Sequence, residues 1–159
     1  MSDKLYESDV FAWSAEQAEL LRRLARGERV NGLDWENLIE EIQDVGISQR
    51  NAVESWLRQT LVHLLKICAW PTSESVEHWK EEASNFLADA AERYTPSMRQ
   101  TLNIDRIFAK ARRQVERIEM RGLPRLNLPD TCPLTLDDLL ADDADVNALV
   151  ARLKSAAPH

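Results

Sequence analysis

The chain has 159 residues, of which 44% are hydrophobic, and it carries a formal net charge of −7 at pH 7. This size and composition are typical of one domain with its own core, and the charge argues against non-specific nucleic-acid binding. Two widely separated cysteines exclude a disulfide framework. The polar first residues argue against a secretion signal, and the lack of an apolar run of about 20 residues argues against a membrane span. Together these features predict a cytoplasmic protein.

The first helix is expected between Asp9 and Gly27. Asp9 is a favourable N-cap residue, and glycine is the residue most typical of a helix end. Between them, apolar residues recur at the spacing of one helical face: Val10, Trp13, Leu20, Leu21 and Leu24. An Asn-Gly pair at positions 31 and 32 then predicts a turn.

A second, long helix is expected from its cap at Asp34 until Pro71, which cannot continue a helix. Its apolar residues keep helical spacing, among them Leu38, Ile42, Val45, Val53, Leu57, Leu61, Leu64 and Leu65. Gly46 interrupts this pattern, because glycine inside a helix costs about 1 kcal/mol relative to alanine. Two interpretations follow: a neighbouring helix approaches closely at Gly46, or the helix bends or breaks there.

Two further helices and a strap are expected after the long helix. Ser73 is the candidate N-cap of a third helix that runs to Tyr94. Pro96 suits the first position of a fourth helix that ends at Gly122. The segment Leu123–Pro133 contains three prolines and few charges, which indicates an ordered strap laid over the other helices.

The C-terminal part of the chain carries one clear helix signal. Thr135, followed three residues later by Asp138, resembles a capping box and predicts a short helix through Leu140. Residues 142–159 are expected to form a marginal helix or a tail. The whole pattern predicts an all-α protein, an up-and-down helical bundle of four main helices with a C-terminal strap and short helix, whose domain covers residues 1–141.

Several blocks of the sequence resemble one bacterial family. They are Leu5-Tyr6, Trp13, Gln17, Leu33-Asp34-Trp35-Glu36-Asn37-Leu38, Glu40-Glu41-Ile42, Gly46, His63-Leu64-Leu65-Lys66, Trp79, Leu123-Pro124, Cys132-Pro133 and Leu139-Leu140. On these residues the chain resembles the family called domain of unknown function 29, uncharacterised proteins common in cyanobacteria and other bacteria. The resemblance implies a helical fold and gives no residue a catalytic role, and the tail after Leu140 departs from the family pattern.

Acidic residues on the long helix are candidate metal ligands. Glu36, Glu40 and Asp44 are four residues apart, so their carboxylates share one face of a helix and could hold a divalent cation. The candidate site is Glu40, Asp44 and His63, which would have to converge between helices. The competing interpretations are a solvated acidic face and a structural histidine that is hydrogen-bonded to an acidic side chain or to a tryptophan.

The fourth expected helix carries a basic stripe, which is a candidate site for an anion or a partner. Arg106, Lys110, Arg113, Arg117 and Arg121 recur every three or four residues, opposite the apolar face of the same helix. The stripe could contact phosphates, an acidic partner, or the acidic residues of this chain at positions 137, 138, 142 and 143. A solvated helix face is the simpler interpretation, and the lack of interleaved aromatic residues disfavours nucleic acid.

The cysteines and tryptophans are assigned mainly to the core. Cys68 is expected to be a small buried hydrophobe, since neither it nor Cys132 has a neighbouring group that would activate a thiol. Four tryptophans lie at or beside apolar helix positions: Trp13, Trp35, Trp56 and Trp79. Trp35 and Trp70 come at helix ends and are the expected surface aromatics.

The sequence therefore favours a non-enzymatic protein-interaction module, bound through the basic stripe or an exposed groove, with self-association as a homodimer as an alternative. No cofactor is expected, because a nucleophile triad, a phosphate loop and a dinucleotide fingerprint do not occur as local motifs. The alternatives are a metal-binding helical-bundle enzyme with a Glu/Asp/His site, and a weak nucleic-acid binder that uses the basic stripe.

Overall fold

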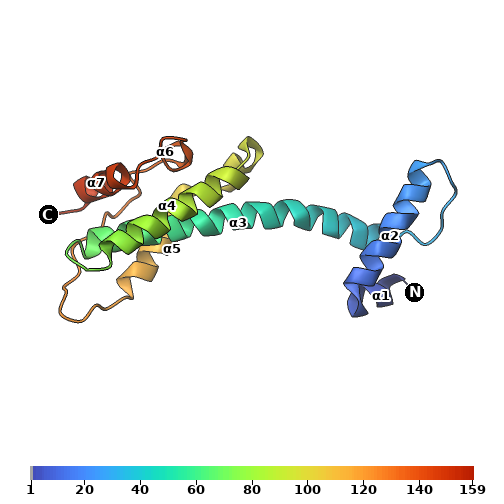
Figure 1. Cartoon of the computed structure of the whole chain (residues 1–159), viewed down its shortest axis with the longest axis horizontal. Helices are drawn as coiled ribbons and strands as arrows, with labels where there is room; N and C mark the ends of the chain where they lie inside the picture. The colour runs from blue at the N-terminus through green and yellow to red at the C-terminus, as the bar shows by residue number, and fades with distance from the viewer. Residues whose placement is uncertain (1) are drawn as a thin grey trace. The chain divides into compact units, whose positions relative to one another are not determined.

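The computed structural model describes residues 2–159, with side chains from residue 4 onward. Within these residues the protein consists of seven α-helices and one 3₁₀ helix, without a strand (Figure 1). The all-α prediction is confirmed. The chain divides into two compact units, residues 1–48 (unit 1) and residues 49–159 (unit 2). The domain over residues 1–141 stays a prediction.

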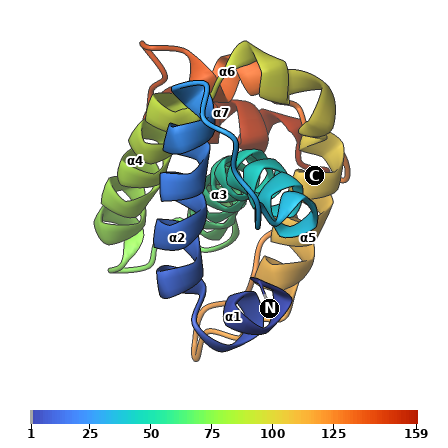
Figure 2. The same ribbon diagram turned by 90° about the vertical axis from the view of Figure 1, so that its right-hand side faces the viewer.

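Unit 1 contains α1 (Ser2–Ser8), α2 (Val10–Ala25) and the beginning of α3 (Trp35–Ala69). Helix α1, which lies against α2 (Figure 2), was not expected from the sequence. Asp9 caps α2 as predicted, because its side chain accepts a hydrogen bond from the amide of Ala12 at 2.9 Å. The helix ends at Gly27, whose φ of 83° allows the chain to reverse, and the amide of Glu28 donates to the carbonyl of Arg23 at 3.1 Å.

A buried polar cluster joins α2 to the loop before α3. The indole of Trp13 donates from Nε1 to Asp34 Oδ2 at 3.0 Å, and the amide of Asp34 donates to Gln17 Oε1 at 2.8 Å. All three residues are buried, and Gln17 also donates to the carbonyl of Gly32 at 3.2 Å. Asp34 caps α3 as predicted, because it accepts from the amide of Asn37 at 3.3 Å. Hydrogen bonds in a dry interior thus fix where α3 begins.

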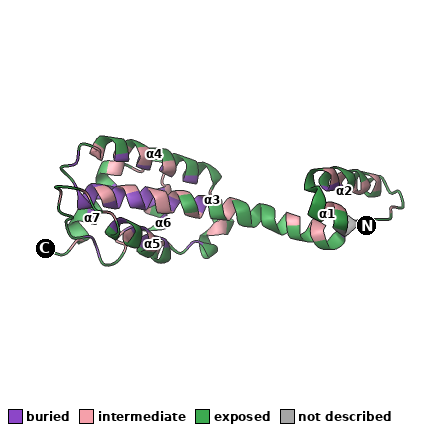
Figure 3. Cartoon of the chain, turned by 90° about the horizontal axis from the view of Figure 1, so that it is seen from below, coloured by how far each residue is buried: buried purple, intermediate pink, exposed green. Residues whose placement is uncertain are grey.

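Unit 2 contains the rest of α3, α4 (Val76–Arg93), the 3₁₀ helix η1 (Pro96–Thr101), α5 (Ile104–Glu116), α6 (Leu136–Leu140) and α7 (Val146–Ala156). One apolar cluster fills its interior, with members from every one of these α-helices, including Val53, Leu57, Leu61, Leu87, Phe108, Leu139 and Leu153. Figure 3 shows that buried residues gather on the part of α3 that belongs to unit 2. Helix α2 belongs to unit 1 and the other expected main helices lie mostly in unit 2, so the arrangement of four main helices in one bundle stays a prediction.

The strap between α5 and α6 covers the end of α3. The indole Nε1 of Trp70 donates to the carbonyl of Leu123 at 3.2 Å, and the amide of Leu126 donates to the carbonyl of Ala69 at 2.9 Å. Leu128 and Leu134 are buried in the core cluster. The prediction that Trp70 is a surface aromatic is wrong: it is only 2% exposed, because the strap supplies both a cover and a hydrogen-bond acceptor.

Several helix boundaries differ from those expected. Helix α4 starts at Val76 rather than after Ser73, whose hydroxyl instead accepts from the amide of Ser75 within a turn. The fourth expected helix is split into η1 and α5, because Asn103 accepts from the amide of Arg106 and so caps a new helix. It also ends at Glu116, before Gly122. The capping box at the start of α6 is confirmed.

Gly46 and the C-terminal residues also resolve questions left by the sequence. Helix α3 continues through Gly46, and a Cβ placed there would meet nothing within 4 Å, so the expectation of close packing at this residue is wrong. Residues 142–159, expected to be a marginal helix or a tail, contain α7. This helix buries Leu149, Val150 and Leu153, which explains why it is held as part of unit 2.

Candidate functional site

Helix α5 has two chemically different faces. Its apolar residues Ile107, Phe108, Ala111 and Val115 are buried in the core of unit 2. The predicted basic residues Arg106, Lys110 and Arg113 lie on the same helix, Arg117 is its C-cap, and Arg121 lies beyond its end. The stripe is therefore interrupted, because the helix stops before the last of its five members.

Three residues of the stripe meet a fourth cation from α3. Lys110, Arg113 and Arg117, together with Gln114 and Arg58, line a surface hollow of about 540 Å³, called here the basic hollow. Arg106 and Arg121 do not line it. Arg58 and Gln114 were not identified from the sequence. The sequence shows only that Arg58 is a polar residue next to Leu57, which is buried in the structure. Nothing in the sequence indicates that α5 lies beside this part of α3.

The four cations of the basic hollow form no ion pair with any residue in the described part of the chain. By contrast, Arg152 pairs with Asp138 at 2.9 Å, and Arg99 pairs with Asp137. Arg152 lowers the pKa of Asp138 to about 2, chiefly by its hydrogen bond, and Arg99 likewise lowers the pKa of Asp137. Of the contacts considered for the stripe, those with Asp137 and Asp138 are thus taken by Arg99 and Arg152, which lie outside it.

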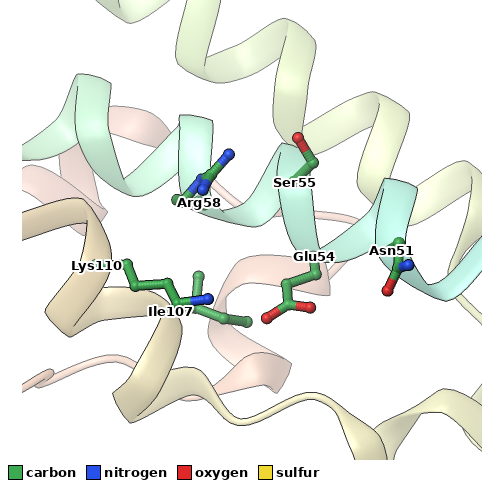
Figure 4. A pocket seen from close by; sticks show the side chains of 6 residues that line it. All are labelled: Asn51, Glu54, Ser55, Arg58, Ile107 and Lys110. Carbon is green, nitrogen blue, oxygen red and sulfur yellow. The ribbon is translucent and has the colours of Figure 1, made fainter. Parts of the chain in front are cut away.

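Arg58 is shared between the basic hollow and a smaller neighbouring one. The smaller hollow, of about 150 Å³, is lined by Asn51, Glu54, Ser55, Arg58, Ile107 and Lys110 (Figure 4). In Figure 4 the side chain of Lys110 extends toward Glu54, whose carboxylate is already paired with Arg50. The Nε atom of Arg58 is buried and has no hydrogen-bond partner within the described residues. This donor is costly to leave unsatisfied in a folded protein.

The three candidate metal ligands are not brought together. Glu40 and Asp44 are exposed residues of unit 1, whereas His63 belongs to unit 2 and lies nineteen residues beyond Asp44 along α3, more than five helical turns. In the part of the chain that the structure describes, no group of three or more His, Cys, Asp or Glu side chains is placed to hold a metal ion. The metal-site hypothesis stays a prediction.

His63 makes contacts typical of a structural histidine. Its Nδ1 atom lies 2.7 Å from the carbonyl oxygen of Gln59, to which it donates, and its ring centroid lies 5.5 Å from that of Phe86. The partner is therefore a backbone carbonyl and not the acidic side chain or tryptophan that was expected. Burial lowers the pKa of His63, because the charged imidazolium loses water, and this effect outweighs the opposite effects of the Gln59 carbonyl and of the Glu82 carboxylate.

Cys68 is a buried hydrophobe, as predicted, and is 3% exposed. Burial raises the pKa of its thiol to about 11, so that the reactive thiolate is disfavoured. Cys132 is partly buried, and burial raises the pKa of its thiol too. Neither cysteine therefore has the character of a nucleophile.

The second candidate surface is an apolar face on the first part of α3. Its members lie at helical spacing and are largely exposed: Trp35 (55%), Ile39 (54%), Ile42 (70%) and Val45 (64%). The helical spacing noted in the sequence places Ile42 and Val45 on the apolar side of α3. They are exposed because α2 meets α3 through the cluster of Trp13, Gln17 and Asp34 at the start of the helix and leaves the following turns uncovered.

Acidic side chains flank the apolar face. Residues 35–48 include four acidic residues, Glu36, Glu40, Glu41 and Asp44, and no lysine or arginine. The carboxylate of Glu41 accepts a hydrogen bond from the hydroxyl of Tyr6 at 2.7 Å, which raises the pKa of Tyr6 to about 12. Helical spacing places Glu36 and Glu41 on the two sides of the apolar face and Glu40 and Asp44 on the opposite side of α3, so the flanks of the face are negatively charged.

Comparisons with known proteins agree with the helical fold. None of the helices in the described residues is apolar over enough of its length to cross a membrane. A comparison with curated proteins finds no match. Among solved structures, the chain is similar to an alpha-helical protein of unknown function from Rhodospirillum rubrum, with 31% sequence identity and a TM-score of 0.66, over 93% of this chain and 96% of that one. The model of the family described as domain of unknown function DUF29 matches residues 5–144, and the chain belongs to this family, as its sequence blocks indicated.

Proposed function

We propose that the protein is a non-enzymatic, cytoplasmic protein-interaction module, and that its partner binds the apolar face of α3. The observation that carries this proposal is the exposure of Trp35, Ile39, Ile42 and Val45 on one side of a single helix. Monomeric proteins rarely expose contiguous large apolar side chains, and such surfaces mark interaction sites. Side chains of these types supply contact area and contain no group that transfers protons or attacks a substrate.

The energy available from this face is adequate for a specific contact. Complete burial of one such side chain is worth about 1.5–3 kcal/mol, so four half-exposed side chains supply roughly 4 kcal/mol before the cost of association. Trp35 is the strongest candidate for an energetic hot spot, since tryptophan is enriched among residues that dominate binding. A partner must add contacts of its own around this centre.

The charges around the face define the chemistry of the partner. A surface with an apolar centre and a border of lysine or arginine would complement Glu36 and Glu41, which flank the face. A second copy of this chain, bound face to face, would place acidic side chains opposite acidic side chains. We therefore favour a different protein with a basic border over a homodimer.

The proposal is tested by co-purification from the native host. The tagged chain is compared with a variant carrying Ile39→Ser and Ile42→Ser, and with the control Leu126→Ser, which changes an exposed apolar residue of unit 2. We expect the same partner with the wild type and with the control, and its loss with the double variant. If the double variant retains every partner, the proposal is contradicted. If the purified wild-type chain sediments as a dimer and the double variant sediments as a monomer, the face mediates self-association instead.

A further inference from the structure

The basic hollow gathers positive charge that no acidic residue of the described chain neutralises. Lys110 and Arg113 of α5, its C-cap Arg117 and Arg58 of α3 line it, and none of them forms an ion pair with a residue that the structure describes. Arginine remains protonated at any physiological pH, so the repulsion between these side chains is permanent. A bound anion would remove this repulsion and would accept charge-assisted hydrogen bonds from these side chains.

The two walls of the hollow are held by the core of unit 2. Arg58 follows Leu57, which is fully buried, and the basic residues of α5 alternate with the buried Ala111 and Val115. The backbone positions that carry the cations are thus fixed by packing before any ligand arrives. Such preorganisation lowers the conformational cost of binding.

We propose that the basic hollow binds an oligophosphate anion, the group common to inorganic polyphosphates and nucleoside triphosphates. One phosphate group carries a charge of about −1.5 to −2 and would leave part of a cluster of four cations unbalanced, whereas linked phosphates can balance all four. Guanidinium groups match phosphate oxygens in pairs, and the amide of Gln114 adds a further donor. A volume of about 540 Å³ has room for several linked phosphates.

The lining of the hollow indicates that the phosphates, and not a base, are recognised. All five residues that line it are basic or carry an amide, so none offers an aromatic surface on which a base could stack. We therefore expect inorganic tripolyphosphate and ATP to bind with similar affinity. This site lies in unit 2 and is independent of the apolar face, so either proposal can fail without the other.

Isothermal titration of the full chain with inorganic tripolyphosphate at low salt tests the site. Arg58→Gln, and separately the double variant Arg113→Gln with Arg117→Gln, should weaken binding about tenfold or more, because each removes charge-assisted hydrogen bonds. Arg106→Gln and Arg121→Gln are matched controls: they remove the same charge from the same stripe but lie outside the hollow, and they should change the affinity less than about twofold. The thermal midpoint of each variant shows that it is folded.

Parallel titrations with ATP and orthophosphate identify the source of the anion. Equal affinities for ATP and tripolyphosphate support recognition of the phosphates alone, whereas ATP that binds much more tightly than tripolyphosphate would overturn it, because the lining offers no surface for a base. No binding of tripolyphosphate, equal losses in the control variants, or orthophosphate binding as tight as tripolyphosphate would overturn the proposal. A single-stranded oligonucleotide that binds more tightly than tripolyphosphate would overturn it too, in favour of a nucleic-acid surface.

Discussion

Replacing Asp34 by alanine removes the centre of the polar cluster in unit 1. Its carboxylate accepts hydrogen bonds from the Trp13 indole at 3.0 Å, the Asn37 side chain at 2.8 Å and the Asn37 amide at 3.3 Å. Loss of the helix cap costs about 1 kcal/mol. The indole N–H that stays buried without an acceptor costs a further 1–3 kcal/mol or so. The variant should therefore lower the free energy of unfolding of unit 1 by roughly 2–4 kcal/mol.

Native-state hydrogen exchange of the α2 amides measures the opening of unit 1 separately from the unfolding of unit 2. The matched control is Asp9→Ala, which also removes an N-cap carboxylate but is exposed and accepts from the amide of Ala12 alone. We expect this control to cost about 1 kcal/mol. If Asp34→Ala destabilises unit 1 by no more than Asp9→Ala does, the buried cluster does not hold the start of α3 and the argument fails.

Three further results are expected. Burial lowers the pKa of His63 in the native protein below its unfolded value near 6.5, so the folded state binds this proton less readily than the unfolded state does. As the pH falls from about 7 to 5, the urea midpoint of the wild type should therefore decrease relative to that of His63→Phe. Urea midpoints of the two proteins that change in parallel with pH would refute this. Cys68 is buried and its thiol pKa is raised to about 11, so it should react with iodoacetamide at pH 8 only after denaturation. Peptide mass spectrometry measures this labelling. Rapid labelling of Cys68 in the native protein would contradict its burial. Asp44 and His63 are far apart along α3, so untagged protein purified without chelator should contain no stoichiometric metal. Inductively coupled plasma mass spectrometry measures this. A stoichiometric ion that is lost in the Glu40→Gln and His63→Ala variants would establish the metal site instead.

Features that depend on neighbouring residues could be predicted from the sequence. The caps at Asp9 and Asp34 and the capping box of Thr135 are short-range hydrogen bonds between residues three positions apart, so the residue types alone indicate them. The helices that they begin were placed correctly for the same reason. Asn103 is an equally good cap, and giving it more weight would have separated η1 from α5.

Features that depend on distant parts of the chain could not be predicted. Helical periodicity shows that Ile42 and Val45 lie on an apolar face, but it does not show whether anything covers that face. Trp70 is buried because a strap more than fifty residues later in the sequence crosses it. The candidate site was found in part: spacing identified the cations of α5, whereas Arg58 joins them only through the packing of α3 beside α5.

Photo-crosslinking at the apolar face tests the central claim most directly. A photoreactive amino acid replaces Ile42, the most exposed member of the face, and replaces Leu126 in a control, and both chains are irradiated in cells of the native host. We predict a single heavier adduct from position 42 and none from position 126, with the crosslinked partner peptide containing lysine or arginine beside apolar residues. No adduct at position 42, or the same adducts at both positions, would contradict the claim that α3 binds a protein through this face.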